Sequence, residues 1–232
     1  IVLCIYTGAK IDKEKYGLKP VYDGRLLFKV LNLSVWSMLH AFISVAPWFL
    51  FFVAIEHLGK TELAISNITR SVSAIFFVIA NSFAVTTGSL VSNAIGAGAR
   101  KELFPICHKV LKLGYAVGFP LVVVALLCNR WIVSFYTDNE LLVELAFAPF
   151  VVMLLNYTFA LPGYVYLNAV GGTGKTKITF LFQVTTTCVY LVYLYWLSFC
   201  IEASLSLYLT AEYLFVILLA LQSIIYLKSK HY

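Results

Sequence analysis

Several ionisable side chains lie inside long apolar segments of this sequence, where an unpaired charge is costly. Glu212 lies well inside the last apolar run, about seven residues from one end. Hydrocarbon disfavours an ionised carboxylate unless the group faces a cavity or a partner, so such a residue is a candidate for function. Glu212 is therefore the first candidate for a group that binds and releases protons. A solvated or hydrogen-bonded structural acid would fit the same position.

Arg70 and His40 lie inside two earlier apolar segments. Arg70 is about ten residues into its segment, where an ion pair or a side chain extended toward the interface is favoured over contact with a bound molecule. His40 shares one face of its segment with Ser37 and Ser44. Histidine can exchange a proton near neutral pH, although a single one on a half-polar face is more often only hydrogen-bonded. His40 is thus the second candidate for cation exchange.

The segment from Thr61 to Gly98 carries its polar residues along one side. They recur at helical offsets of three, four, seven and eleven, and they are Asn67, Arg70, Ser71, Asn81, Ser82, Ser89, Ser92 and Asn93. Such a stripe is expected to face protein or water and not lipid. The candidates for contact with a cavity or a bound compound are Asn81, Ser82, Ser89, Ser37, Ser44 and, from a later segment, Asn156 and Tyr157.

The composition is that of a membrane protein with several spans. Hydrophobic residues make up 61% of the chain and charged residues 12%, against roughly 45–50% and 25% in soluble domains. The net charge of +6 comes from basic residues at the ends of apolar runs, so it does not indicate a nucleic-acid partner. The five cysteines lack the spacing of a metal site or a disulfide framework, so neither is expected.

Six apolar runs are long enough to cross a bilayer as helices. We expect an all-α, polytopic fold in which residues 1–29 hold the end of a preceding helix and a basic loop, and residues 30–232 form a six-helix transmembrane unit. Prolines at 149 and 162 predict kinks in the fourth span. The expected spans are Val30–Ile55, Thr61–Gly98, Phe104–Asn129, Leu141–Val170, Ile178–Ile201 and Ser206–Leu227.

The basic residues predict the orientation of the spans. Six alternating spans put fourteen lysines and arginines on one side and only Lys60 and Arg130 on the other. Because basic loops stay in the cytoplasm, both ends of the chain are expected there, in the inner (plasma) membrane of the cell.

The loop from Ala169 to Thr176 reads AVGGTGKT and resembles a loose phosphate-binding loop. A true phosphate loop joins a strand to a helix in an α/β domain. This one follows a long uncharged run, so a glycine-permitted tight turn with interfacial lysines is the better interpretation. Since no nucleophile, base and orienting group cluster on one face, no catalytic residues and no enzyme activity are expected.

Four stretches together resemble the second half of a multidrug and toxic compound extrusion (MATE) transporter. They read HLGKTELAISNITRS, SLVSNAIGAGARKEL, FYTDNELLVELA and YLNAVGGTGKTKI, in this order over nearly the whole chain. The resemblance implies a cation-driven exporter of twelve helices in two six-helix lobes, of which this chain would be the carboxyl-terminal lobe. It implies amphipathic or cationic organic substrates, an amino-terminal lobe as partner, and H+ or Na+ as coupling ion without any cofactor.

One departure from the family pattern concerns the coupling cation. Several members bind it through acids in the first and fourth helices of this lobe, where this chain has the regions of Ser44 and Ala160 instead. Sodium coupling through this lobe is disfavoured, which leaves Glu212 or an acid in the other lobe. Two alternatives remain: a lipid-linked saccharide flippase of the same superfamily, which would need a strongly basic cavity, and a nontransporting half-protein.

Overall fold

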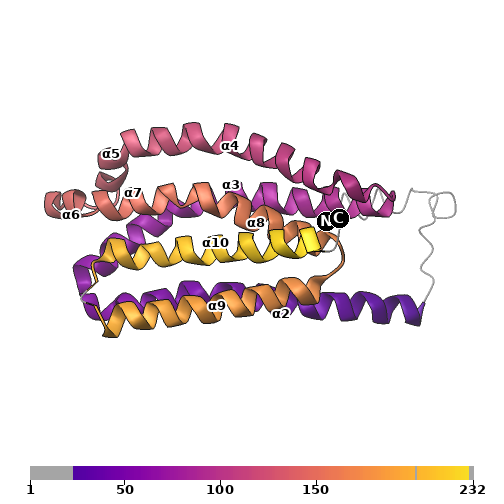
Figure 1. The fold of residues 1–232 in the computed structure, drawn as a ribbon. Coiled ribbons are helices and arrows are strands. Elements are labelled where there is room, and N and C mark those ends of the chain that lie inside the picture. Colours follow the sequence, from indigo (N-terminus) through magenta and orange to yellow (C-terminus); the bar gives the residue numbers. More distant parts are fainter. Residues whose placement is uncertain (1–22, 202, 230–232) are drawn as a thin grey trace, which may run out of the picture.

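The computed structural model describes residues 23–201 and 203–229, and in these ranges the fold is helical with no strand. Six helical segments are long and apolar enough to cross a membrane, which confirms the predicted fold class (Figure 1). The helices are α2 (Gly24–Ile55), α3 (Lys60–Gly96), α4 (Leu103–Leu127), α5 (Asn129–Ser134), α6 (Glu140–Leu145), α7 (Phe147–Leu155), α8 (Tyr157–Gly172), α9 (Thr176–Phe199) and α10 (Leu205–Ser229).

The long helices lie side by side, with α4 at one edge and α2 with α9 at the other (Figure 1). Between these edges, α8 packs on both α3 and α10, and α10 packs on α9. The α2–α3 and α9–α10 connections lie at one end of the bundle, and the α3–α4 and α8–α9 connections lie at the other (Figure 1). This alternation is the one expected for six consecutive membrane spans.

The first span begins earlier than its apolar run predicts. Asp23 is the N-cap of α2, and its carboxylate accepts hydrogen bonds from the backbone N–H groups of Arg25 and Leu26. The helix therefore starts at Gly24, and the expectation of a loop up to Lys29 is wrong. A capping aspartate satisfies free N–H groups at a helix start, and this local signal extends the helix beyond the apolar run. The expected end of a preceding helix lies outside the described residues.

The fourth span is interrupted twice, which produces α6, α7 and α8. Pro162 has no backbone N–H to give to the carbonyl of Thr158, one turn earlier. The hydroxyl of Tyr115 in α4 donates to that carbonyl at 2.7 Å instead. The hydroxyl of Tyr213 in α10 likewise donates to the carbonyl of Val152, near the break at Asn156. Neighbouring helices thus satisfy the backbone where this span departs from regular helix.

Two glycines let α4 approach α8 closely. Gly114 and Gly118 are four residues apart, and a Cβ at Gly118 would lie 2.2 Å from ring atoms of Tyr157. The hydroxyl of Tyr157 donates to the carbonyl of Gly114 at 2.8 Å. Small residues at this spacing are a common device for helix association in lipid, where apolar burial gives little driving force. The pair fixes the start of α8 against α4.

The loop between α8 and α9 is a tight turn, as the sequence predicts. Only residues 173–175 separate the two helices, and Gly174 has φ +79°, a left-handed conformation that glycine adopts without strain. No strand precedes the turn in the described part of the chain, so the context of a phosphate loop is not found there.

Candidate functional site

A buried ion pair joins α3 to α10. Nη2 of Arg70 lies 2.6 Å from Oε1 of Glu212, and the exposed fractions of the two side chains are only 4% and 9%. This contact confirms the ion-pair interpretation of Arg70 over extension to the interface. It also gives the buried carboxylate of Glu212 the partner that a charge in an apolar span requires.

The pair lies deep along the helices. Arg70 is ten residues after Lys60, which is about 15 Å along a helix rising about 1.5 Å per residue. Glu212 is seven residues after Leu205, or about 10 Å along α10. Both starts belong to the end of the bundle that holds the α2–α3 turn (Figure 1), so the pair lies within the apolar part of the lobe.

Aromatic rings of α2 enclose the guanidinium. Its central carbon lies 4.0 Å from the ring centroid of Phe51, 5.2 Å from that of Trp48 and 5.4 Å from that of Phe52. Ring faces attract cations, and the attraction grows when water is excluded. Tyr190 of α9 donates to Oε1 of Glu212 at 3.3 Å. Four helices, α2, α3, α9 and α10, therefore meet at one charge pair.

The pair borders a small internal cavity of about 40 Å³. Nε and Nη1 of Arg70 and Oδ1 of Asn156 are buried and have no hydrogen-bond partner among the described residues. A polar cavity of this size has room for about one or two water molecules. The cavity is lined by Trp48, Arg70, Ser73, Phe76, Phe77, Ala80, Met153, Asn156, Tyr157, Ala160, Tyr164 and Glu212.

Three of the candidates predicted from the sequence come together at this cavity: Glu212, Asn156 and Tyr157. The Tyr157 hydroxyl is already engaged by α4, so its ring is what the cavity can use. Sequence reasoning missed Trp48 as part of the site. The one signal for Trp48 was its place directly after Pro47 in the middle of a span. That signal is not specific, because aromatic residues are frequent throughout this chain.

His40 and Ser37 belong to a different cavity, of about 380 Å³, near the α8–α9 turn. It is bordered by Gly88, Asn168 and Thr179, and Nε2 of His40 is buried there without a partner among the described residues. His40 is eight residues before Trp48 on α2, about 12 Å along the helix. The structure thus separates the two candidates for cation exchange.

The remaining candidates point elsewhere. The hydroxyl of Ser44 donates to the carbonyl of Ala41 in its own helix at 2.7 Å. Asn81, Ser82 and Ser89 are exposed on the outer face of α3. Ser82 donates to the carbonyl of Val78 at 2.8 Å, which satisfies its proton and leaves its oxygen free to accept a bond. This face is available to a second lobe or to a bound compound.

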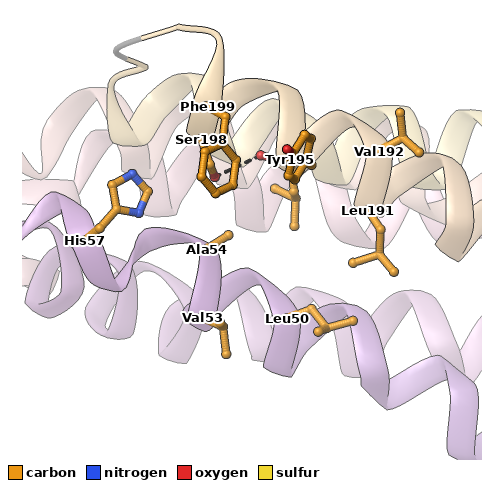
Figure 2. A pocket seen from close by; sticks show the side chains of 10 residues that line it. Leu50, Val53, Ala54, His57, Leu191, Val192, Tyr195, Ser198 and Phe199 are labelled. Atoms are coloured by element: carbon orange, nitrogen blue, oxygen red, sulfur yellow. Dashed lines mark hydrogen bonds between the residues drawn. The ribbon is translucent and has the colours of Figure 1, made fainter.

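A larger groove of about 530 Å³ runs between α2 and α9. Figure 2 shows side chains of both helices along it, with His57 toward one end, Leu191 and Val192 toward the other, and Leu50 and Tyr195 between them. The Ser198 hydroxyl already donates to the carbonyl of Leu194. Among its described lining residues the groove has no carboxylate, lysine or arginine, so it offers apolar contact and little chemistry.

The family model MatE matches residues 37–197, which is most of the six-helix unit. The chain belongs to the MatE family. It is a multi-pass membrane protein. An uncharacterised transporter of Schizosaccharomyces pombe is 31% identical to it over 100 residues, which are 43% of this chain and 19% of that transporter. The comparison covers too little of that protein to transfer a function.

Solved structures share the fold at low identity. A MATE crystal structure in the bent conformation matches 88% of this chain and 45% of its own, with a TM-score of 0.77 at 18% identity. The outward-facing structure of a multidrug resistance MATE transporter of the MOP superfamily matches 92% of this chain and 49% of its own, with a TM-score of 0.76 at 17% identity. A MOP superfamily transporter from Pyrococcus furiosus, described as having reversed pocket polarity, matches 85% of this chain and 43% of its own. Its TM-score is 0.70 at 17% identity. The chain therefore spans about half the length of these structures.

Proposed function

We propose that this chain forms one lobe of a secondary active transporter that exports amphipathic or cationic organic compounds in exchange for protons or sodium ions. The observation that carries the proposal is the MatE match over residues 37–197 on a six-helix unit that covers about half of the similar structures. A second six-helix lobe completes the transporter, and the compound is carried between the lobes. The exposed polar face of α3, with Asn81, Ser82 and Ser89, borders that space.

The charge of the lobe supports an organic cation as substrate more than a lipid-linked pyrophosphate. A flippase for such an anion needs an excess of positive charge at its cavity. Arg70 is the one cation that lines the described internal cavity, and Glu212 neutralises it. Export of organic cations is therefore proposed over lipid flipping, and the transport assay described below distinguishes it from a nontransporting half-protein.

Glu212 is the lobe's candidate for proton coupling. In the present arrangement Arg70 holds its carboxylate by a 2.6 Å contact. Protonation of Glu212 would remove the charge that binds Arg70 and free α10 from α3, so proton binding and helix movement would be linked. His40 remains a second candidate in its own cavity.

The test is transport by the purified full-length protein in liposomes, with the present chain alone as the matched control. A fluorescent organic cation such as ethidium is expected to be carried by the full-length protein and not by the chain alone. Lipid-linked saccharide is expected to stay in its leaflet. Movement of the lipid without movement of ethidium would replace the exporter by the flippase, and movement of neither would favour a nontransporting protein.

A further inference from the structure

We infer that the Arg70 guanidinium is a tethered cation that occupies the only described carboxylate site inside this lobe, so that no free sodium ion binds there while the pair is intact. The absence of sodium binding at the intact pair follows from the geometry of the pair alone. Its consequence, that any sodium coupling resides outside this cavity, deepens the proposed function and rests on it.

The cavity has the donor groups of a site for a small hard cation. Glu212 supplies a carboxylate, and Asn156 supplies an amide oxygen with no hydrogen-bond partner among the described residues. Outside the cavity lining, the hydroxyl of Tyr190 donates to the same carboxylate. Hard cations prefer such oxygen ligands, with carboxylates foremost. In this structure the cationic group next to the carboxylate is Arg70, at 2.6 Å.

The charge count at the cavity leaves no room for a second cation. Of the groups that face the pair, α2 supplies the uncharged rings of Trp48, Phe51 and Phe52, and α9 supplies Tyr190. The cavity linings from α7, α8 and the break between them are Met153, Asn156, Tyr157, Ala160 and Tyr164, and none of them is an acid. A sodium ion added beside the intact pair would place two positive charges on one carboxylate, which is unfavourable in a buried site.

Displacing the guanidinium is equally unfavourable. Its stem is fixed on α3, so it competes with a free ion at a high effective concentration. The exposed fraction of Arg70 is 4%, and three rings cover the guanidinium. A displaced guanidinium would have to stay in an apolar interior without its counter-charge, which costs more than sodium binding returns.

Removing the tethered cation should convert the cavity into a site for free cations. Arg70→Ala leaves Glu212 unpaired beside the space that the guanidinium filled. In the full-length protein in detergent, we expect this variant to melt below the wild type and to regain several degrees with sodium or millimolar methylguanidinium, but not with choline at equal ionic strength. The matched control is Arg70→Ala with Glu212→Gln, which should show no specific gain from either cation.

The wild type is expected to bind no sodium through Glu212: its melting temperature should be equal in sodium and choline, and Glu212→Gln should leave the number of ²²Na⁺ ions bound unchanged. Arg70→Lys keeps the charge and should also stay insensitive to sodium, and its behaviour tests the idea if Arg70→Ala does not fold. Sodium binding to the wild type that Glu212→Gln abolishes would overturn the inference. So would an Arg70→Ala protein that folds and responds to neither cation. These readouts do not require transport, so a failed ethidium assay would leave them intact.

Discussion

At the scale of single residues, the described part of the lobe holds a buried charge pair, and a membrane interior permits a charge only with a partner. Arg70 and Glu212 are each buried, and each is the other's neutralising group. A buried pair adds little net stability compared with apolar residues of the same shape, while removing one partner is severe because the other is left uncompensated. The pair therefore specifies how α3 and α10 meet more than how strongly they bind.

Glu212→Gln is expected to lower the free energy of unfolding by about 3–5 kcal/mol, because it leaves the guanidinium of Arg70 buried without a counter-charge. The measurement is thermal or denaturant unfolding of the full-length protein. Arg70→Met with Glu212→Leu is the matched control and should lie close to the wild type. Equal losses in the single and double variants would show that side-chain packing, and not the charge, is responsible.

Glu212→Gln also distinguishes a role of Glu212 in proton coupling from a purely structural role in holding Arg70. If Glu212 carries the coupling proton, the protein that folds should still bind its organic cation while its export loses dependence on pH. If Glu212 only holds Arg70, the surviving protein should keep the pH profile of the wild type at lower abundance. A variant with unchanged abundance and unchanged pH profile would move the search to His40 or to the other lobe.

At the scale of the elements, the number and approximate positions of the spans follow from run length, but the early start of α2 and the interruptions of the fourth span do not. A helix needs about 20 apolar residues to cross the bilayer, so the six runs place six spans. The fourth span was expected to bend at Pro149 and Pro162, and its breaks lie at Ala146 and Asn156, before each proline. Pro162 frees the carbonyl of Thr158, which accepts from Tyr115 of α4, and Tyr213 of α10 donates to the carbonyl of Val152 beside the break at Asn156.

The residues of the site could be predicted from the sequence only in part, because the sequence does not say which helices are neighbours. The cost of a charge in an apolar run identified Glu212, and the polar groups of the fourth span identified Asn156 and Tyr157; these three residues share one cavity. Sequence reasoning could not pair Arg70 with a residue 142 positions away, because periodicity gives the phase of each helix and not its neighbour. It also could not separate His40 from Glu212, since both are simply ionisable groups in apolar runs.

Gly118→Ala tests the contact of α4 with α8. Its Cβ would lie 2.2 Å from the ring of Tyr157, so the helices must move apart, and we expect a loss of about 1–3 kcal/mol. Gly96→Ala is the matched control, because nothing lies within 4 Å of the added carbon. The measurement is the melting temperature of both variants. A Gly118→Ala protein as stable as Gly96→Ala would contradict the close approach.

At the scale of the whole molecule, the lobe collects its basic residues at one end. The α3–α4 and α8–α9 connections share that end with the start of α2 (Figure 1). They carry Arg25, Arg100, Lys101, Lys175 and Lys177, while Lys60 and Arg130 lie near the opposite end. Positive residues favour the cytoplasmic side, so we predict that the α8–α9 turn is cytoplasmic.

Labelling of introduced cysteines tests this orientation. Lys175→Cys is suitable because the residue is exposed, whereas Gly172 is not, since an added Cβ would lie 2.4 Å from the carbonyl oxygen of Gly88. In a background without native cysteines, Lys175→Cys should react with an impermeant maleimide only after the cells are opened. Asp138→Cys, exposed near the other end, should react in intact cells. The reverse pattern would invert the lobe.

Gradient-driven transport is the most direct test of the claim that this family lobe serves a cation-coupled exporter. The full-length protein is reconstituted in liposomes, and ethidium movement is followed under an imposed pH gradient or an imposed sodium gradient at equal pH. The account predicts that the pH gradient drives ethidium against its concentration gradient and that Glu212→Gln removes this effect. Ethidium movement that ignores both gradients would contradict secondary active transport, and sodium-driven movement abolished by Glu212→Gln would contradict the role assigned to Arg70.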